Sequence, residues 1–241
     1  MKLSSREVYD RLVNEDRILE QEGQISFNFG DVGIVVKQRD TVGNILQEWL
    51  QGWLDSRNID YALSENSQMP PDFFLDPADK TKNLLEVKAY NYNASPGFDI
   101  ADFRMYETEI IDKPYMLDVD YLIFGYDMDD TGIVTIKNLW IKKVWEITSS
   151  SEKWPMKLQV KKNVVHKIRP CNWDSASTHY KTFARLEDFI SAIEETVYQN
   201  PDTRKESSTW KYKFLKSYEE FYGVRLSIPR WDDIRDEYCP K

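Results

Sequence analysis

The sequence predicts an α/β fold in which helices flank a central mixed β-sheet. Apolar residues recur at helical spacing near the N-terminus and again over residues 41–56 and 186–198, and apolar runs of strand length lie between these segments. The chain has 241 residues, 41% of them hydrophobic, which is enough to bury a sizeable core. We therefore expect one large domain, or a core with an appended piece.

The first sixty residues are predicted to form two helices and a hairpin. The first helix covers residues 4–21 and begins with Ser4 and Glu7, which match a capping box. A Gly-Asp-Val-Gly turn joins two expected strands within residues 25–37. The second helix is expected over residues 41–56, where apolar residues again fall on one face.

Further along the chain, strands and helices are expected to alternate. Asp99 is predicted to begin a helix that ends near residue 111, and residues 119–126 give the strongest signal of a buried strand. The remaining expected elements are a strand at 133–141, a short helix at 142–147, a basic hairpin at 157–168, helices at 186–198 and 206–222, and a tryptophan-bearing tail at 229–238.

Two short segments carry most of the chemical information. Asp72 follows two prolines, and Glu86, Val87 and Lys88 follow two leucines in a strand-like run. Side chains alternate along a strand, so Glu86 and Lys88 share one face while Val87 points into the core. Residues 76–80 have strong turn chemistry and predict a hairpin that brings Asp72 back to Glu86.

Two carboxylates and an ammonium at one end of a hairpin suit a Mg²⁺-dependent phosphodiester hydrolase. Mg²⁺ prefers oxygen ligands, for which the expected donors are Asp72, Glu86 and the carbonyl of Val87. Lys88 is expected to hold or help deprotonate the attacking water. A surface hairpin with an ordinary Glu/Lys face remains the alternative, because 30% of the residues are charged and the same letters occur often by chance.

Composition restricts the partners and the compartment. The net charge of −9 argues against a simple nucleic-acid binder, yet residues 137–169 contain nine basic and two acidic residues, a local charge of +7. Two cysteines indicate a reducing compartment without a disulfide framework. No apolar run approaches about 18 residues, and the first residues do not resemble a signal peptide. We expect a soluble cytoplasmic protein with no membrane contact.

The residues Pro71-Asp72 and Glu86-Val87-Lys88 resemble the signature of the PD-(D/E)XK nuclease superfamily. The wider sequence at residues 68–72, 85–92, 94–103 and 113–117 resembles a small family of type II restriction endonucleases that cut the interrupted palindrome GGNNCC. The resemblance extends from the N-terminus to about residue 200. It implies a PD-(D/E)XK core and a Mg²⁺-dependent homodimer that cuts double-stranded DNA at the centre of its site. It also implies a cognate methyltransferase that protects the host.

The resemblance assigns the catalytic roles to Asp72, Glu86 and Lys88, and makes Glu48, on the helix before the hairpin, the best candidate for a further acid near the metal. A solvent-facing helix carboxylate is the alternative for Glu48. The candidate DNA contacts are Gln68, Asn91, Asn93, Ser95, Arg104, Lys142, Lys143, Lys161, Lys162, Lys167 and Arg169. Ordinary turn chemistry and ion-paired surface charges are the alternatives for these residues.

A single endonuclease domain is expected over residues 1–241. It would comprise N-terminal helices and a hairpin (1–60), a catalytic and DNA-binding core (61–200) and a C-terminal helical extension (201–241). Two other functions stay open. One is a structure-selective nuclease of the same superfamily, such as a junction resolvase or repair enzyme, and the other is a DNA-binding or protein-interaction module without catalysis.

Overall fold

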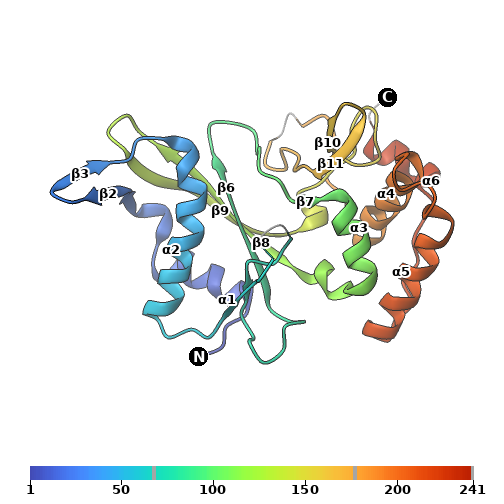
Figure 1. Ribbon diagram of the computed structural model, residues 1–241, viewed down its shortest axis with the longest axis horizontal. Coiled ribbons are helices and arrows are strands. Elements are labelled where there is room, and N and C mark those ends of the chain that lie inside the picture. The colour runs from blue at the N-terminus through green and yellow to red at the C-terminus, as the bar shows by residue number, and fades with distance from the viewer. Residues whose placement is uncertain (67–68, 176–177, 240–241) are drawn as a thin grey trace. The chain divides into compact units, whose positions relative to one another are not determined.

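The computed structural model describes residues 1–66, 69–175 and 178–239 (Figure 1). Their contacts divide the chain into two compact units. Unit 1 contains Met1–Glu65, Pro71–Phe98 and Asp120–Lys142, and unit 2 contains Asp99–Val119, Lys143–Lys241 and the described part of Asn66–Pro70. These boundaries do not coincide with the segment limits expected at residues 60 and 200. The assignment of one domain to the whole chain stays a prediction.

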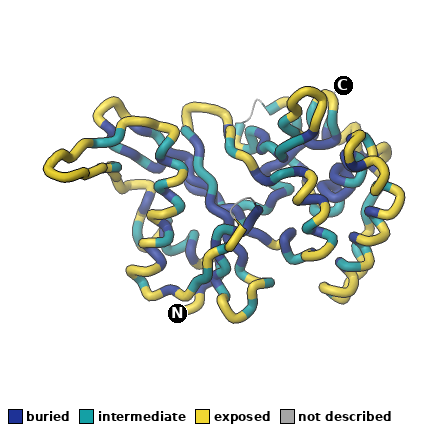
Figure 2. The backbone as a smooth tube through the Cα atoms, in the orientation of Figure 1, coloured by how far each residue is buried: buried dark blue, intermediate teal, exposed yellow. Residues whose placement is uncertain are grey.

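Unit 1 is built on a six-stranded sheet with the order β1-β9-β8-β6-β5-β4. The central strands β6 and β8 pair in parallel, whereas β5 pairs with β6 and β4 with β5 in the antiparallel sense. Figure 2 shows β6 and β8 as largely buried. The strands are β1 (Glu22–Gln24), β4 (Ala62–Leu63), β5 (Phe73–Phe74), β6 (Leu84–Asn91), β8 (Asp120–Met128) and β9 (Ile133–Lys143). The predicted α/β fold with a mixed sheet flanked by helices is confirmed.

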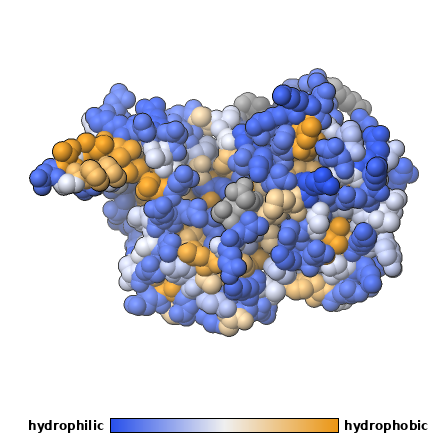
Figure 3. Space-filling view, viewed as in Figure 1, coloured by the Kyte–Doolittle hydropathy of each residue, from blue (hydrophilic) through white to orange (hydrophobic). Residues whose placement is uncertain are grey.

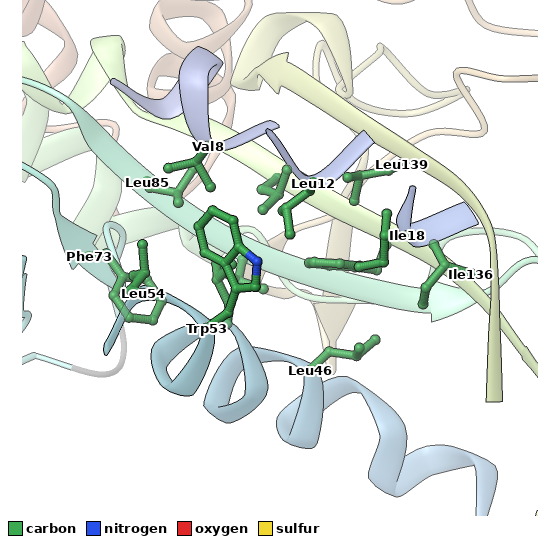
Figure 4. Packing of buried hydrophobic residues seen from close by; sticks show 14 of the residues in the cluster. Val8, Leu12, Ile18, Leu46, Trp53, Leu54, Phe73, Leu85, Ile136 and Leu139 are labelled. Atoms are coloured by element: carbon green, nitrogen blue, oxygen red, sulfur yellow. The ribbon is translucent and has the colours of Figure 1, made fainter. Parts of the chain in front are cut away.

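Two helices of unit 1, α1 (Ser5–Asp10) and α2 (Val42–Ser56), contribute to one hydrophobic core. Figure 4 shows Val8 of α1 and Trp53 of α2 packed beside Leu85 of β6. Val87 belongs to the same core, as the strand alternation predicts. This face of β6 therefore fixes where the strand lies, and the alternate residues project away from it.

The first predicted helix forms but is interrupted. The Ser4–Glu7 capping box is present at the start of α1. The chain then passes through a π-helical segment, η1 (Arg11–Glu15), and a 3₁₀ turn, η2 (Ile18–Glu20), separated by a residue in the left-handed region. The prediction of one continuous helix over residues 4–21 is therefore wrong. Apolar residues keep a helix-like spacing through all three segments, so the sequence pattern does not reveal where one type of helix changes into another.

The predicted N-terminal hairpin consists of β2 (Ser26–Phe29) and β3 (Val32–Val35). Its turn has two residues, Gly30 and Asp31, instead of the four predicted. Gly30 has a φ of 57°, which a two-residue hairpin turn of this kind needs and which glycine adopts at little cost. The second strand therefore begins earlier than the sequence pattern indicated.

The described residues of unit 2 form a three-stranded sheet, in the order β10-β11-β7, and four α-helices. Asp102, not Asp99, caps the first of these helices, because Ala101–Asp102 forms a short strand that pairs with β11. The elements are β7 (Ala101–Asp102), α3 (Phe103–Asp112), η4 (Pro114–Asp118), η5 (Val144–Glu146), β10 (Leu158–Lys161), β11 (Val164–Ile168), α4 (Leu186–Gln199), α5 (Ser207–Tyr222) and α6 (Trp231–Tyr238).

Two further expectations in unit 2 need correction. The short helix expected over residues 142–147 is only the 3₁₀ turn η5, since Lys142 and Lys143 still belong to β9. The tail expected at residues 229–238 contains a regular helix, α6, whose Tyr238 hydroxyl donates a hydrogen bond to buried Asp188 of α4 at 2.6 Å. Within the described ranges, no helix is both long and apolar enough to cross a membrane.

Candidate active site

The β5–β6 hairpin of unit 1 brings Asp72 to Glu86. Phe73 pairs with Leu85, so Asp72, one residue before β5, arrives beside the middle of β6. The connecting turn is held by its own carboxylates: Asp76 accepts a hydrogen bond from the N–H of Ala78, and Asp79 accepts one from the N–H of Thr81. The predicted hairpin is therefore confirmed.

Both carboxylate oxygens of Asp72 have protein donors. The backbone N–H of Val87 donates to Oδ2 at 2.8 Å, and the side-chain amide of Gln47 donates to Oδ1 at 2.9 Å. Burial raises the pKa of the Asp72 carboxyl above its ordinary value, and Lys88, Val87 and Gln47 oppose that rise. The two donors hold the carboxylate in one orientation beside β6.

Glu86 is almost fully buried, with 4% of its surface exposed, and forms an ion pair with Lys88. The distance from the Lys88 ammonium to Oε1 is 2.6 Å. Burial raises the pKa of the Glu86 carboxyl to about 7; Lys88 opposes the rise and the neighbouring Asp72 adds to it. A buried acid next to a second acid and a lysine is the kind of environment that functional sites often show.

The second oxygen of Glu86, Oε2, is buried and has no hydrogen-bond partner among the described residues. A buried carboxylate oxygen without a partner is costly unless a cation or a donor satisfies it. Asp72 keeps further lone pairs beside it. No group of three or more acidic, histidine or cysteine side chains that could hold a metal occurs in the described part of the chain. A pair of carboxylates nevertheless fits Mg²⁺, which usually binds one or two of them and completes its shell with water and phosphate oxygens.

Helix α2 reaches this site through Gln47. Glu48, the acid proposed from the sequence, is exposed on the same helix, and its role stays a prediction. The sequence reasoning missed Gln47, although it lies between Leu46 and Leu50, two buried residues of the helix face that packs against the sheet. The position of polar Gln47 next to these buried residues is the sequence feature that could have predicted its contact with the site.

The same face of β6 continues from Lys88 into an aromatic stack. The Trp140 ring stacks on Tyr90 with a centroid distance of 5.8 Å and on Tyr92 with 6.2 Å. Gly125 makes room for it, because a Cβ there would lie 2.9 Å from both the Trp140 and the Tyr92 rings. Tyr92, which directly follows β6, is 41% exposed, so an orientated aromatic ring lies just beyond the strand that carries Glu86 and Lys88.

The sequence of residues 90–98 is polar and predicts a loop after the catalytic strand, but the first two of these residues still belong to β6. Asn91 is the last residue of β6 and not part of the loop, and its side chain accepts a hydrogen bond from the N–H of Asn93 at 2.9 Å. Asn93 and Ser95 are exposed. Gln68 lies outside the described residues. Any contact of these residues with DNA stays a prediction.

The basic candidates of unit 2 differ in their surroundings. Lys167 lies 3.9 Å from the carboxylate of Asp102, and Arg169 forms an ion pair with Asp99. Lys143 donates from its ammonium to the carbonyl of Asp118 at 2.5 Å. The candidates that are exposed are Arg104 on α3 and Lys161 and Lys162 at the turn of the β10–β11 hairpin. Lys142, on β9 in unit 1, is partly buried.

Comparison with known proteins identifies the family of the chain. The family model of the NgoBV restriction endonuclease matches residues 2–238. The type II restriction enzyme NlaIV of Neisseria lactamica is 60% identical over 242 aligned residues that cover all of both chains. The type II restriction enzyme NgoBV of Neisseria gonorrhoeae is 54% identical over 162 residues, which are 67% of this chain and 92% of that protein.

The fold gives the same answer. A solved structure of the NlaIV restriction endonuclease superposes with a TM-score of 0.98 at 60% identity, covering 100% of this chain and 98% of the other. The resemblance to restriction endonucleases drawn from the sequence is thus confirmed at the level of the family. The two relatives named above are type II restriction enzymes. The sequence match over nearly the whole chain and the matching fold show that the chain belongs to the NgoBV restriction endonuclease family.

Proposed function

We propose that this chain, as a type II restriction endonuclease, makes Mg²⁺-dependent double-strand breaks in DNA at a short palindromic site. The site we propose is GGNNCC, cut at its centre to leave blunt ends. The observation that carries the proposal is the juxtaposition of Asp72 with buried Glu86, whose Oε2 has no partner in the described chain, and with Lys88. This is the side-chain set of a PD-(D/E)XK nuclease, the superfamily to which we assign the chain.

In this proposal, Asp72, Glu86 and the carbonyl of Val87 would hold Mg²⁺. When bound, the metal supplies charge neutralisation at the scissile phosphate and a bound water of lowered pKa. The N–H of Val87 and the amide of Gln47 keep the Asp72 carboxylate aimed at the site. Glu86 would have to be ionised to hold the metal, because a carboxylate ligand binds in its charged form.

Lys88 is proposed to act beside the two carboxylates. Its ammonium is 2.6 Å from Glu86 and shares a strand face with it, so it can donate to the attacking water and to the developing negative charge. Glu48 is proposed as a further acid near the metal, reaching it from α2. Both roles follow from position and from the resemblance to the nuclease signature.

The DNA contacts proposed for phosphate positioning are Lys142, Lys143, Lys161, Lys162, Lys167 and Arg169. Those proposed for reading base edges are Gln68, Asn91, Asn93 and Ser95, and Arg104 is proposed to contact either a phosphate or a guanine. One catalytic set per chain and a palindromic site together call for a two-fold homodimer, in which each copy reads one half and cuts one strand. A cognate methyltransferase would be the genetic partner that protects host DNA.

The deciding experiment is digestion of unmethylated phage DNA by the wild type, Lys88→Ala and a matched control, Lys82→Ala. Lys82 is an exposed lysine on the turn of the same hairpin, paired with Asp79. We expect discrete fragments from the wild type and Lys82→Ala with Mg²⁺, and none with EDTA or from Lys88→Ala. Sequencing the fragment ends tests GGNNCC and the central cut.

Three results would contradict the proposal in different ways. Absence of cleavage by folded wild type would leave a DNA-binding or interaction module. Cleavage confined to branched DNA would indicate a structure-selective nuclease. Cleavage that persists in EDTA would exclude the metal roles of Asp72 and Glu86.

A further inference from the structure

The β2–β3 hairpin of unit 1 presents a continuous apolar face to solvent. Phe27 pairs with Ile34 and Phe29 with Val32, and residues that pair directly across two strands project on the same face. All four are exposed, by 57% for Phe27, 79% for Phe29, 68% for Val32 and 54% for Ile34. Figure 3 shows this hairpin as a protruding hydrophobic surface.

The exposed apolar area of this face is large for one hairpin. Taking about 200 Å² for a phenylalanine and about 160 Å² for valine and isoleucine, the four residues expose roughly 470 Å². This is the size of the largest apolar patch on a typical monomeric protein, about 300–600 Å², and such patches are often functional. An isolated two-stranded hairpin is also only marginally stable in water, so a partner that covers this face would stabilise it.

An apolar groove lies at the base of the same hairpin. It has a volume of ≈ 180 Å³, comparable with cavities of about 150 Å³ that accept a benzene ring. Its apolar lining residues are Ile18, Ile25, Ile45, Leu46, Trp49 and Ile136. Ile25 also leads directly into β2, so the groove and the hairpin belong to one continuous part of unit 1.

We propose that this surface is the contact between two copies of the chain, in which the hairpin of each copy inserts Phe29 into the groove of the other. The inference rests on the proposed function, because cutting both strands with one catalytic set per chain requires two chains. A two-fold contact needs both complementary parts on the same molecule, and unit 1 carries both. It would supply a substantial part of the about 800 Å² per partner that stable complexes bury.

The charge of the hairpin favours a protein partner over DNA. Residues 25–36 contain no lysine or arginine and one acid, Asp31, at the turn. Binding to the DNA backbone depends on basic side chains that replace counterions, and an acid at the tip would be repelled by phosphates. The apolar groove offers matching chemistry for the hairpin.

The test is sedimentation velocity at micromolar protein without DNA or Mg²⁺, comparing the wild type with Phe29→Asp and Ile45→Arg. We expect the wild type at twice the chain mass of 28.6 kDa and each variant at the single-chain mass. The dimer dissociation constant of each variant should rise on the order of 100-fold or more, as for a central aromatic contact. Tyr212→Asp is the matched control, since Tyr212 is an exposed aromatic residue of α5 in unit 2 and should leave the dimer intact.

A mixture of the two variants separates a lost contact from a lost fold. Phe29→Asp keeps its groove and Ile45→Arg keeps its hairpin, so one normal contact remains possible between them. In the other contact, the aspartate on the hairpin of one variant meets the arginine in the groove of the other. Equimolar mixing should therefore restore dimers that neither variant forms alone, and circular dichroism should match the wild type.

Several outcomes would overturn the inference: a monomeric wild type, single variants that remain dimeric, or a mixture that stays monomeric. Dimeric Phe29→Asp with weakened DNA binding would assign the apolar face to DNA instead. Failure of the proposed cleavage is distinguishable, because the assay contains no substrate and Lys88→Ala should stay dimeric. A dimer disrupted by Phe29→Asp in a protein that cuts no DNA would refute the function but not the interface.

Discussion

Replacement of Gln47 by alanine tests whether the hydrogen bond to Asp72 orients the proposed metal ligand. The side-chain amide of Gln47 donates to the Asp72 carboxylate at 2.9 Å. Hydrogen bonds to charged groups contribute about 1.5–3 kcal/mol to stability. If about 2 kcal/mol of that is expressed in the transition state, the cleavage rate falls about 30-fold. The N–H of Val87 still holds the other oxygen, so we do not expect complete loss.

The assay is single-turnover cleavage of a short duplex at a series of Mg²⁺ concentrations. A less well oriented Asp72 should raise the Mg²⁺ concentration needed for half-maximal rate, which a simple loss of folded protein would not do. Asn44→Ala is the control, because Asn44 is exposed on the same helix one turn earlier. Equal rates and equal Mg²⁺ dependence for Gln47→Ala and the wild type would refute the reasoning, as would an equal defect in Asn44→Ala. Glu48→Ala in the same series tests the proposed role of the exposed acid.

Two further predictions concern stability. Burial raises the pKa of Glu107 to about 7 from an ordinary 4.5. The folded state therefore binds the proton more tightly than the unfolded chain, and the free energy of unfolding should fall as pH rises from 4.5 through about 7, by up to about 3 kcal/mol at 1.36 kcal/mol per pKa unit. Urea titrations should show a decline for the wild type and a smaller one for Glu107→Gln, in which buried Glu86, whose pKa is also raised to about 7, still contributes; equal declines in the two proteins would contradict it. Gly125→Ala should cost about 1–3 kcal/mol because the new methyl meets the Trp140 ring. Gly52→Ala, in open space within α2, should instead gain about 0.5–1 kcal/mol, and a similar loss in both variants would be inconsistent with the packing argument.

Local patterns predicted most of the regular elements well. The helix α2, the buried strand β8 and the helix α4 were expected within a residue or two of where they lie, because each has an apolar period that matches its geometry over many residues. Boundaries that depend on one backbone angle or on a pairing partner were less predictable. The two-residue turn at Gly30 and the short strand that displaces the cap from Asp99 to Asp102 are of this kind.

The sequence by itself determined the family, the hairpin and the strand alternation that puts Glu86 and Lys88 on one face, because these depend on residues close together in the chain. Only the tertiary structure decided which helix residue meets Asp72, since Gln47 and Glu48 differ by 100° around α2 and the docking of that helix selects between them. Tertiary contacts also decided that the basic residues Lys167 and Arg169 face acids, and that the apolar face of the β2–β3 hairpin remains uncovered within the described chain. Contacts between residues far apart in sequence set all of these, so no local pattern contains them.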